Sequence, residues 1–317
     1  MELASFCAAS RVVVVAGKGG VGKTTVTATL ARAATRAGQS VLIVEVEGKS
    51  GLAGAFDQPP LGYEETELAP GLRARTLTPD EALVDYLENA GLRRISRRLA
   101  SSGALDVVSG AVPGMKDILV LGKVKQLEQA GAADLIIIDA PAAGHALTFL
   151  LSPQGLLDAV RVGPIRKQAE DVTAMLSDPD RCRVLLVTTP EETPVTEVAE
   201  TAFYLEDRIG VALGPVVVNG VYPPSRVPVG IDAAGIQNEA ALLDVFVSDR
   251  EAADLARAAD FRVERARVQA TQVERLERML PLPQIHLPFL FSGGVGTEEL
   301  DELTSAFTEG VDTLAAA

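Results

Sequence analysis

Short runs rich in apolar residues alternate along this chain with longer segments whose apolar residues recur every three or four positions. The runs are strand-sized and rich in β-branched residues, which is typical of strands buried on both faces of a parallel sheet. The predicted strands span residues 11–16, 41–46, 72–77, 135–139, 184–188 and 215–219. Because helical segments separate them, the pattern predicts an α/β fold with a wound, mainly parallel sheet flanked by helices.

Three stretches depart from this alternation. Residues 78–131 have helical periodicity and no convincing strand, so we predict a helical excursion between two strands. Residues 220–235 are rich in proline and glycine and are predicted to form a loop. Residues 249–280 predict a long charged helix with one apolar side. The residues on that side include Leu255, Phe261, Val268, Leu276 and Met279. With no internal repeat, we expect a single domain over residues 1–317 that contains the excursion.

The segment after the first predicted strand carries a complete phosphate-binding motif. Residues 17–24 read GKGGVGKT, which matches G-x-x-x-x-G-K-[ST], and residues 24–37 predict a helix directly after it. Glycines let successive N–H groups converge on an anion at the positive end of a helix. Lys23 is expected to reach the β and γ phosphate oxygens, and the Thr24 hydroxyl to ligate Mg²⁺. The predicted ATP contacts are Gly17, Gly19, Gly20, Val21, Gly22, Lys23, Thr24 and Thr25.

Two other predicted strands end in carboxylates. The run LIIID ends at Asp139, which is expected to join Thr24 in the Mg²⁺ shell. The following residues 140–147, APAAGHAL, predict a glycine-centred turn that senses the γ-phosphate. The strand at 41–46 runs into Glu45 and Glu47 of EVEGKS, and one of these carboxylates is expected to position the attacking water.

Charge and cysteine content narrow the possible functions. The chain has 317 residues and a net charge of −14, which opposes non-specific binding to nucleic acid or anionic lipid. We therefore expect no nucleic-acid partner and at most a peripheral, transient membrane contact. Residues 1–10 lack the features of a secretion signal, and the apolar runs are too short to span a bilayer. Because Cys7 and Cys182 suit neither a disulfide framework nor a metal site, a cytoplasmic location is expected.

Four motifs together resemble the deviant Walker A ATPases, a group of dimeric P-loop NTPases. Within that group the chain is most similar to the branch of the arsenical pump ATPase and the tail-anchored-protein-targeting ATPase. The motifs are KGGVGKTT from Lys18, DAPAAGHAL at 139–147, VVVNG at 216–220 and LPFLFSGGVGTEEL at 287–300. Each of the last two is weak alone, but their order along the chain strengthens the resemblance.

The resemblance implies a dimer whose two phosphate loops face each other. Lys18 of one subunit would then reach the phosphates bound by the other and supply charge in trans, as an arginine finger does. It also implies that Asn219, Pro288 and Phe289 contact the nucleotide. The implied function is a MgATP-dependent dimeric switch that hydrolyses ATP to bind, carry or gate a client protein. The dimer would be a homodimer or a heterodimer with a paralogous ATPase.

The chain departs from the branch at several positions. Glu47 stands where the branch has its water-positioning aspartate, so hydrolysis is expected to be slow or to depend on a paralogous partner. Pro141 is displaced by one position from the usual switch proline. The zinc cysteines of the targeting ATPases and the metalloid cysteines of the pumps are absent from the sequence. For His145 and His286 we favour a structural or phosphate-sensing role over metal binding.

Two alternative functions stay open at this point. The first is a partition-type ATPase that positions itself on membrane or nucleoid, although the C-terminal segment 301–317 is acidic rather than basic. The second is the ATPase subunit of an arsenite or anion pump. The excursion offers a single methionine, Met115, where a client groove would be methionine-rich. An arginine-rich flank at 92–99, LRRISRRL, instead suggests a polar client or lipid contact, or simply a solvated face.

Overall fold

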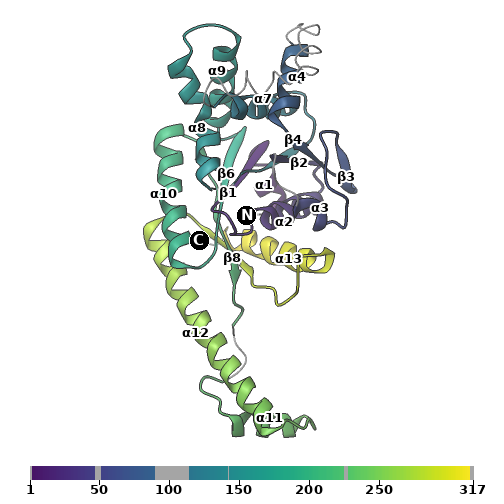
Figure 1. Ribbon diagram of the computed structural model, residues 1–317, viewed down its shortest axis with the longest axis vertical. Coiled ribbons are helices and arrows are strands. Elements are labelled where there is room, and N and C mark those ends of the chain that lie inside the picture. Colours follow the sequence, from purple (N-terminus) through teal and green to yellow (C-terminus); the bar gives the residue numbers. More distant parts are fainter. Residues whose placement is uncertain (1, 47–50, 90–113, 142, 225–227, 315–317) are drawn as a thin grey trace.

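The computed structural model describes residues 2–46, 51–89, 114–141, 143–224 and 228–314 (Figure 1). Within these residues one sheet has nine strands in the order β3-β4-β2-β5-β1-β6-β8-β9, with β7 beside β6. All neighbouring strands are parallel except β3 and β4. The strands are β1 (Val12–Gly17), β2 (Val41–Val46), β3 (Thr66–Ala69), β4 (Leu72–Leu77), β5 (Leu135–Asp139), β6 (Cys182–Thr188), β7 (Ala212–Leu213), β8 (Val216–Val221) and β9 (Gln284–Pro288). The predicted wound α/β sheet is confirmed.

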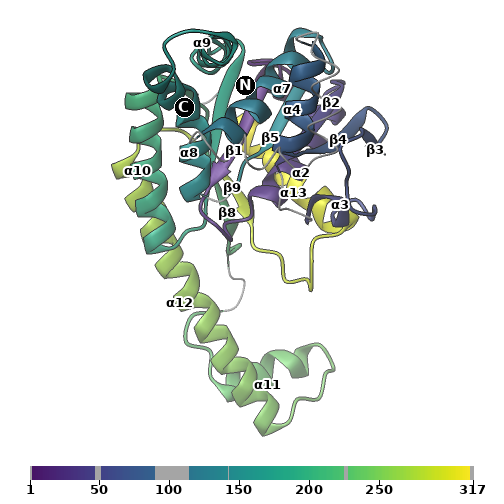
Figure 2. The ribbon, with the colours of Figure 1, turned by 45° about the horizontal axis from the view of Figure 1, so that its top comes forward.

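Helices cover both faces of this sheet (Figures 1 and 2). One face carries α1 (Leu3–Cys7), α2 (Lys23–Arg36), α3 (Gly51–Gly54) and α13 (Thr297–Thr313). The other carries α4 (Pro79–Asn89), α7 (Met115–Gln129), α8 (Ala143–Ala159), α9 (Pro164–Leu176) and α10 (Glu192–Ile209). Since helices lie on both sides, strands such as β5 are buried along their whole length, which is why they read as unbroken apolar runs.

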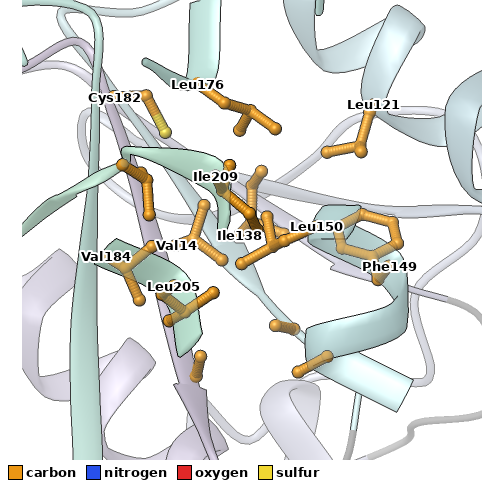
Figure 3. Close-up of a cluster of buried hydrophobic side chains, with 14 of the residues drawn as sticks. Val14, Leu121, Ile138, Phe149, Leu150, Leu176, Cys182, Val184, Leu205 and Ile209 are labelled. Atoms are coloured by element: carbon orange, nitrogen blue, oxygen red, sulfur yellow. The ribbon is translucent and has the colours of Figure 1, made fainter. Parts of the chain in front are cut away.

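The core between the sheet and the second helical layer is built from aliphatic residues and few aromatics. Val14 of β1 and Ile138 of β5 meet Phe149 and Leu150 of α8 in this layer (Figure 3). All four side chains are at most 1% exposed. Burial of this extent contributes roughly 1.5–3 kcal/mol for each large side chain, so the sheet and α8 form one rigid support for the strand ends.

The predicted excursion at 78–131 is described only at its two ends. These ends are α4 and α7, which pack on each other, while residues 90–113, with the arginine flank at 92–99, lie outside the described residues. The single-domain boundary over 1–317 stays a prediction. None of the helices in the described ranges is long and apolar enough to cross a membrane.

A two-helix arm projects from the body beyond β8 (Figures 1 and 2). It consists of α11 (Ala233–Leu242) and α12 (Asp249–Met279), and the C-terminal part of α12 returns the chain to β9. The predicted helix at 249–280 is confirmed within one residue. The predicted loop at 220–235 is wrong at both ends, because Val221 still pairs with Pro288 in the sheet and α11 begins at Ala233.

Candidate functional site

The phosphate loop, residues 18–22, lies at the carboxyl edge of the sheet between β1 and α2. Gly20 and Gly22 have φ values of 84° and 90°, a region that residues with a Cβ rarely adopt. At Gly17 a Cβ would lie 2.2 Å from the carbonyl oxygen of Val187 in β6. Glycine at these three positions therefore gives the loop its curve in front of the first turn of α2, where backbone N–H groups favour an anion.

We expect Gly22→Ala to weaken nucleotide binding more than Gly20→Ala. Both positions strain a side chain, by roughly 1–2 kcal/mol. Only at Gly22 would the new Cβ collide with another side chain, 2.2 Å from Nδ2 of Asn219, whereas Gly20 has no such neighbour within 4 Å. Titration with a fluorescent ATP analogue measures the difference. In an Asn219→Ala background the two variants should lose affinity equally, and a persistent excess loss for Gly22→Ala would contradict the proposed collision.

Thr24 and Asp139 meet at the base of the loop. Thr24 Oγ1 donates a hydrogen bond of 2.7 Å to Asp139 Oδ2. Asp139 ends β5 directly beside Val15 of β1, and its side chain is buried. A hydroxyl and a carboxylate in contact at the phosphate end of a P-loop form an oxygen donor set of the kind Mg²⁺ prefers. The geometry thus brings together the two side chains that the sequence assigned to the metal.

Lys23 and Lys18 lie on opposite sides of the same loop. The Lys23 side chain is buried, and its Nζ donates a 2.8 Å hydrogen bond to the carbonyl oxygen of Lys18. This places the ammonium group inside the curve of the loop. The Lys18 side chain points outward instead and forms a 2.7 Å ion pair with Oε1 of Glu197 on α10.

Glu197 was not found from the sequence. It is 179 positions from Lys18, among the other acidic residues of α10. The two side chains are 40% and 37% exposed, so the pair is a partly screened surface contact, worth no more than about 1 kcal/mol. Such a weak contact can hold Lys18 in one place and still release it.

Asn219, Pro288 and Phe289 lie together where β8 and β9 end, and Asn219 contacts the phosphate loop. Asn219 Nδ2 donates to the carbonyl oxygen of Val21 at 3.0 Å, and Phe289 N donates to the carbonyl oxygen of Val221 at 2.8 Å. Pro288 is the last residue of β9 and pairs with Val221. The sheet therefore brings all three predicted residues, which are distant from the loop in sequence, to its edge.

An aromatic cluster next to these residues was also missed. The ring of Phe289 is 4.8 Å from that of Tyr222 and 5.0 Å from that of Phe291, measured between centroids. The Arg262 guanidinium of α12 lies 4.9 Å from the Phe291 ring. Phe289 and Phe291 are 39% and 64% exposed, so both offer ring surface that a base could stack on.

The structure describes only part of the two segments predicted to act at the γ-phosphate, residues 45–50 and 140–147. Glu45 is buried in β2 and accepts a 3.1 Å hydrogen bond from Thr76 of β4, while Glu47 lies outside the described residues. The glycine-centred turn predicted at 140–147 is corrected, because Gly144 lies in the first turn of α8. Alanine and leucine continue the helical pattern there, and one glycine costs a helix only about 1 kcal/mol. Residue 142 is outside the described residues as well.

Of the remaining predicted loop contacts, Val21 and Thr25 have structural roles in the described fold. Val21 is buried, and the carbonyl oxygen of Thr25 accepts a 2.9 Å hydrogen bond from the hydroxyl of Thr29.

Three features together define the class of protein as a P-loop ATPase. They are a parallel sheet, a glycine loop that leads into a helix, and a Thr–Asp pair at the carboxyl edge of the sheet.

Comparison with known proteins agrees with this class. The anion-transporting ATPase family matches residues 10–162. The ATPase BagA of Mycobacterium tuberculosis is 30% identical over 94% of this chain and 93% of its own length. The ATPase get3 of Schizosaccharomyces japonicus is 30% identical over 49% of this chain and 50% of its own. A Halobacterium salinarum protein provisionally named an arsenical pump-driving ATPase is 27% identical over 65% and 35%. The chain belongs to the anion-transporting ATPase family, and it binds and hydrolyses ATP.

Proposed function

We propose that the chain is a MgATP-dependent switch that works as a dimer and uses ATP hydrolysis to bind, carry or gate a client protein. The observation that carries this proposal is the position of Lys18. Its ammonium group points out of the loop that Lys23 fills, and we place the second subunit at that edge. A cation in that place is suited to the phosphates of a neighbouring subunit rather than to its own.

The proposal gives each residue of the site a role. Lys23 would contact the β and γ phosphates, and Thr24 and Asp139, which are in contact, would hold a Mg²⁺ that neutralises phosphate charge. Glu47 orients the attacking water. The base lies on the far side of the loop, against Asn219 and the aromatic cluster of Tyr222, Phe289 and Phe291. The second subunit is a copy of this chain or a paralogous ATPase, and both work in the cytoplasm.

The two cysteine thiols, of Cys7 and Cys182, do not support the arsenical-pump alternative. Burial raises the pKa of Cys7 and that of Cys182 to about 12. Both thiols are therefore protonated at neutral pH and enclosed, whereas a metalloid site requires accessible thiolates. The partition-type alternative would use a basic helix to bind a membrane, whereas the first turn of α13 carries Glu298 and Glu299.

The proposed dimer is tested by sedimentation velocity in the presence of ADP, MgATP and ATP with EDTA. A Glu47→Gln background is used because the amide should slow hydrolysis and preserve the ATP state. We expect a dimer with MgATP, and a monomer with ADP or without the metal. A monomer in all three conditions, or a dimer that ignores nucleotide and metal, would contradict a nucleotide-driven switch.

Glu197→Gln is the matched variant for the same measurement. Removing the carboxylate breaks the ion pair that holds Lys18 within its own subunit, so the dimer should form at a lower protein concentration. Because a surface ion pair contributes up to about 1 kcal/mol, we expect the dissociation constant of the dimer to fall about two- to fivefold. Glu200→Gln, on an exposed turn of the same helix, is the control and should leave the midpoint unchanged. A Glu197→Gln dimer weaker than wild type would contradict the restraining role.

A further inference from the structure

The arm of α11 and α12 is supported by the body only near its base. The 31 residues of α12 make it about 46 Å long, far longer than its contact with α10. Of these residues, Ala252, Ala256, Gln269 and Leu276 are buried, and α11 buries none. Figures 1 and 2 agree that the tip stands clear of the sheet and its helices.

Large apolar side chains are concentrated on this unsupported part. Thirteen large hydrophobic side chains are exposed in the described part of the chain, and eight of them lie on the arm or at its entry. They are Val229, Leu242, Leu243, Val245, Phe246, Leu255, Phe261 and Val268. Phe246 is 91% exposed. Apolar surface gathered in this way marks an interaction site, because water disfavours it.

The arm nevertheless has a defined shape of its own. Ser248 and Glu251 form a reciprocal capping box at the start of α12. Gln237 of α11 donates a 2.8 Å hydrogen bond to Asp249 in the first turn of α12. The Asp232 side chain caps α11 by accepting from Gly235 N at 2.8 Å. The apolar side chains are therefore presented outward by an ordered hairpin of helices.

The base of the arm is joined to the helix that holds Lys18. Arg265 and Arg275 of α12 contact Glu191 and Thr196 at the start of α10, at 3.1 and 3.0 Å. The next residue, Glu197, is the partner of Lys18. The chain enters the arm from β8, and Asn219 of this strand contacts the phosphate loop. The arm thus leaves the body at the same edge as the phosphate loop.

Charge is divided along the arm. From residue 232 to 260 it has seven acidic and two basic residues. From residue 261 to 279, the half near the body, it has five basic and three acidic residues. Two arms laid side by side in the same direction would repel each other at both ends. Antiparallel arms would instead place each acidic tip beside a basic base.

We propose that the arm docks, antiparallel, on the arm of a second copy of this chain. This inference rests on the proposed dimer, whose subunits approach each other at the carboxyl edges of their sheets. Two subunits related by a two-fold axis at that edge have arms that run in opposite directions past each other. The apolar side chains of the tip and of the outer face of α12 would then be covered, and the charge halves would match.

The apolar contact is tested with Phe246→Ser plus Phe261→Ser, measured by sedimentation with MgATP in the Glu47→Gln background. Both side chains are exposed, so the monomer should remain folded and bind ATP as before. We expect the dissociation constant of the dimer to rise at least tenfold. Phe203→Ser, an exposed phenylalanine on α10, is the control and should leave it unchanged. A dimer of wild-type strength in the double variant would overturn the proposal.

The antiparallel arrangement is tested by exchanging charges. Glu239→Lys, Asp254→Lys and Asp260→Lys together change the charge of the tip from −5 to +1, and Arg267→Glu plus Arg278→Glu change that of the base from +2 to −2; all five residues are exposed. Each set alone should weaken the dimer, and the two sets together in one chain should restore it. A client or a paralogous partner on the arm would give no such restoration, and that result would also overturn the proposal. If wild type forms no dimer with MgATP, the proposed function has failed; if it does and the arm variants match it, only this inference has failed.

Discussion

Lys18→Ala is expected to lower the turnover of ATP roughly 10³-fold, at the lower end of what a cation supplied in trans contributes. The reason is that Lys18 points out of its own loop and pairs with the half-buried carboxylate of Glu197, while Lys23 occupies the loop interior. Loss of Lys18 should therefore leave the bound nucleotide in place and remove charge stabilisation from the transition state. Steady-state turnover and calorimetric ATP affinity, measured on the same preparation, separate these effects.

The matched control for this experiment is Lys167→Ala, which removes an exposed lysine on α9. It should keep both turnover and affinity. The assay uses this chain alone, since a paralogous subunit in a heterodimer would supply the missing lysine to the site of the variant. If Lys18→Ala then hydrolyses ATP at the wild-type rate, the assignment of Lys18 to catalysis is wrong.

Lys23→Ala should act mainly on ATP affinity, which we expect to fall about 10- to 100-fold. A loss of this extent corresponds to hydrogen bonds to a charged group, which contribute about 1.5–3 kcal/mol. The ammonium group of Lys23 is buried and bonds to the loop backbone, so its removal also loosens the loop around the phosphates. Lys18→Ala serves as the control, because it removes the same charge from the same loop. Unchanged ATP affinity in Lys23→Ala, with folding verified by thermal denaturation, would remove the central role of the loop.

The sequence predicts best those strands whose pattern follows from burial alone. β2, β4 and β5 have the bounds that their patterns predict, and for β2 and β5 the reason is that both faces of the strand are covered, so the run is mostly apolar. β3 and β9 escape prediction. β3 is a short antiparallel edge strand, and β9 contains Gln284, His286 and Pro288, which are atypical of a buried strand.

The residues of the site also divide into those that the sequence predicts and those that it does not. Gly17 to Thr24 and Asp139 are readable because each chemical role requires its residue type at a fixed distance from a strand end. Glu197 and the Tyr222–Phe291 contact are not readable, since they depend on segments brought together only by the folded sheet. The apolar side of a helix usually packs on the core of the protein. In the structure Leu276 packs, whereas Leu255, Phe261 and Val268 face outward because the helix leaves the body.

The most direct test of the account mixes two inactive variants, Lys18→Ala and Lys23→Ala, each with its own affinity tag. In a mixed dimer the subunit with Lys18→Ala still binds ATP through its own Lys23, and its partner supplies an intact Lys18. Mixed dimers captured through both tags should hydrolyse ATP, and an equal mixture should reach about a quarter of wild-type turnover, since half of the dimers are mixed and each has one complete site. Captured mixed dimers that stay inactive would contradict the account, because Lys18 would then act only within its own subunit.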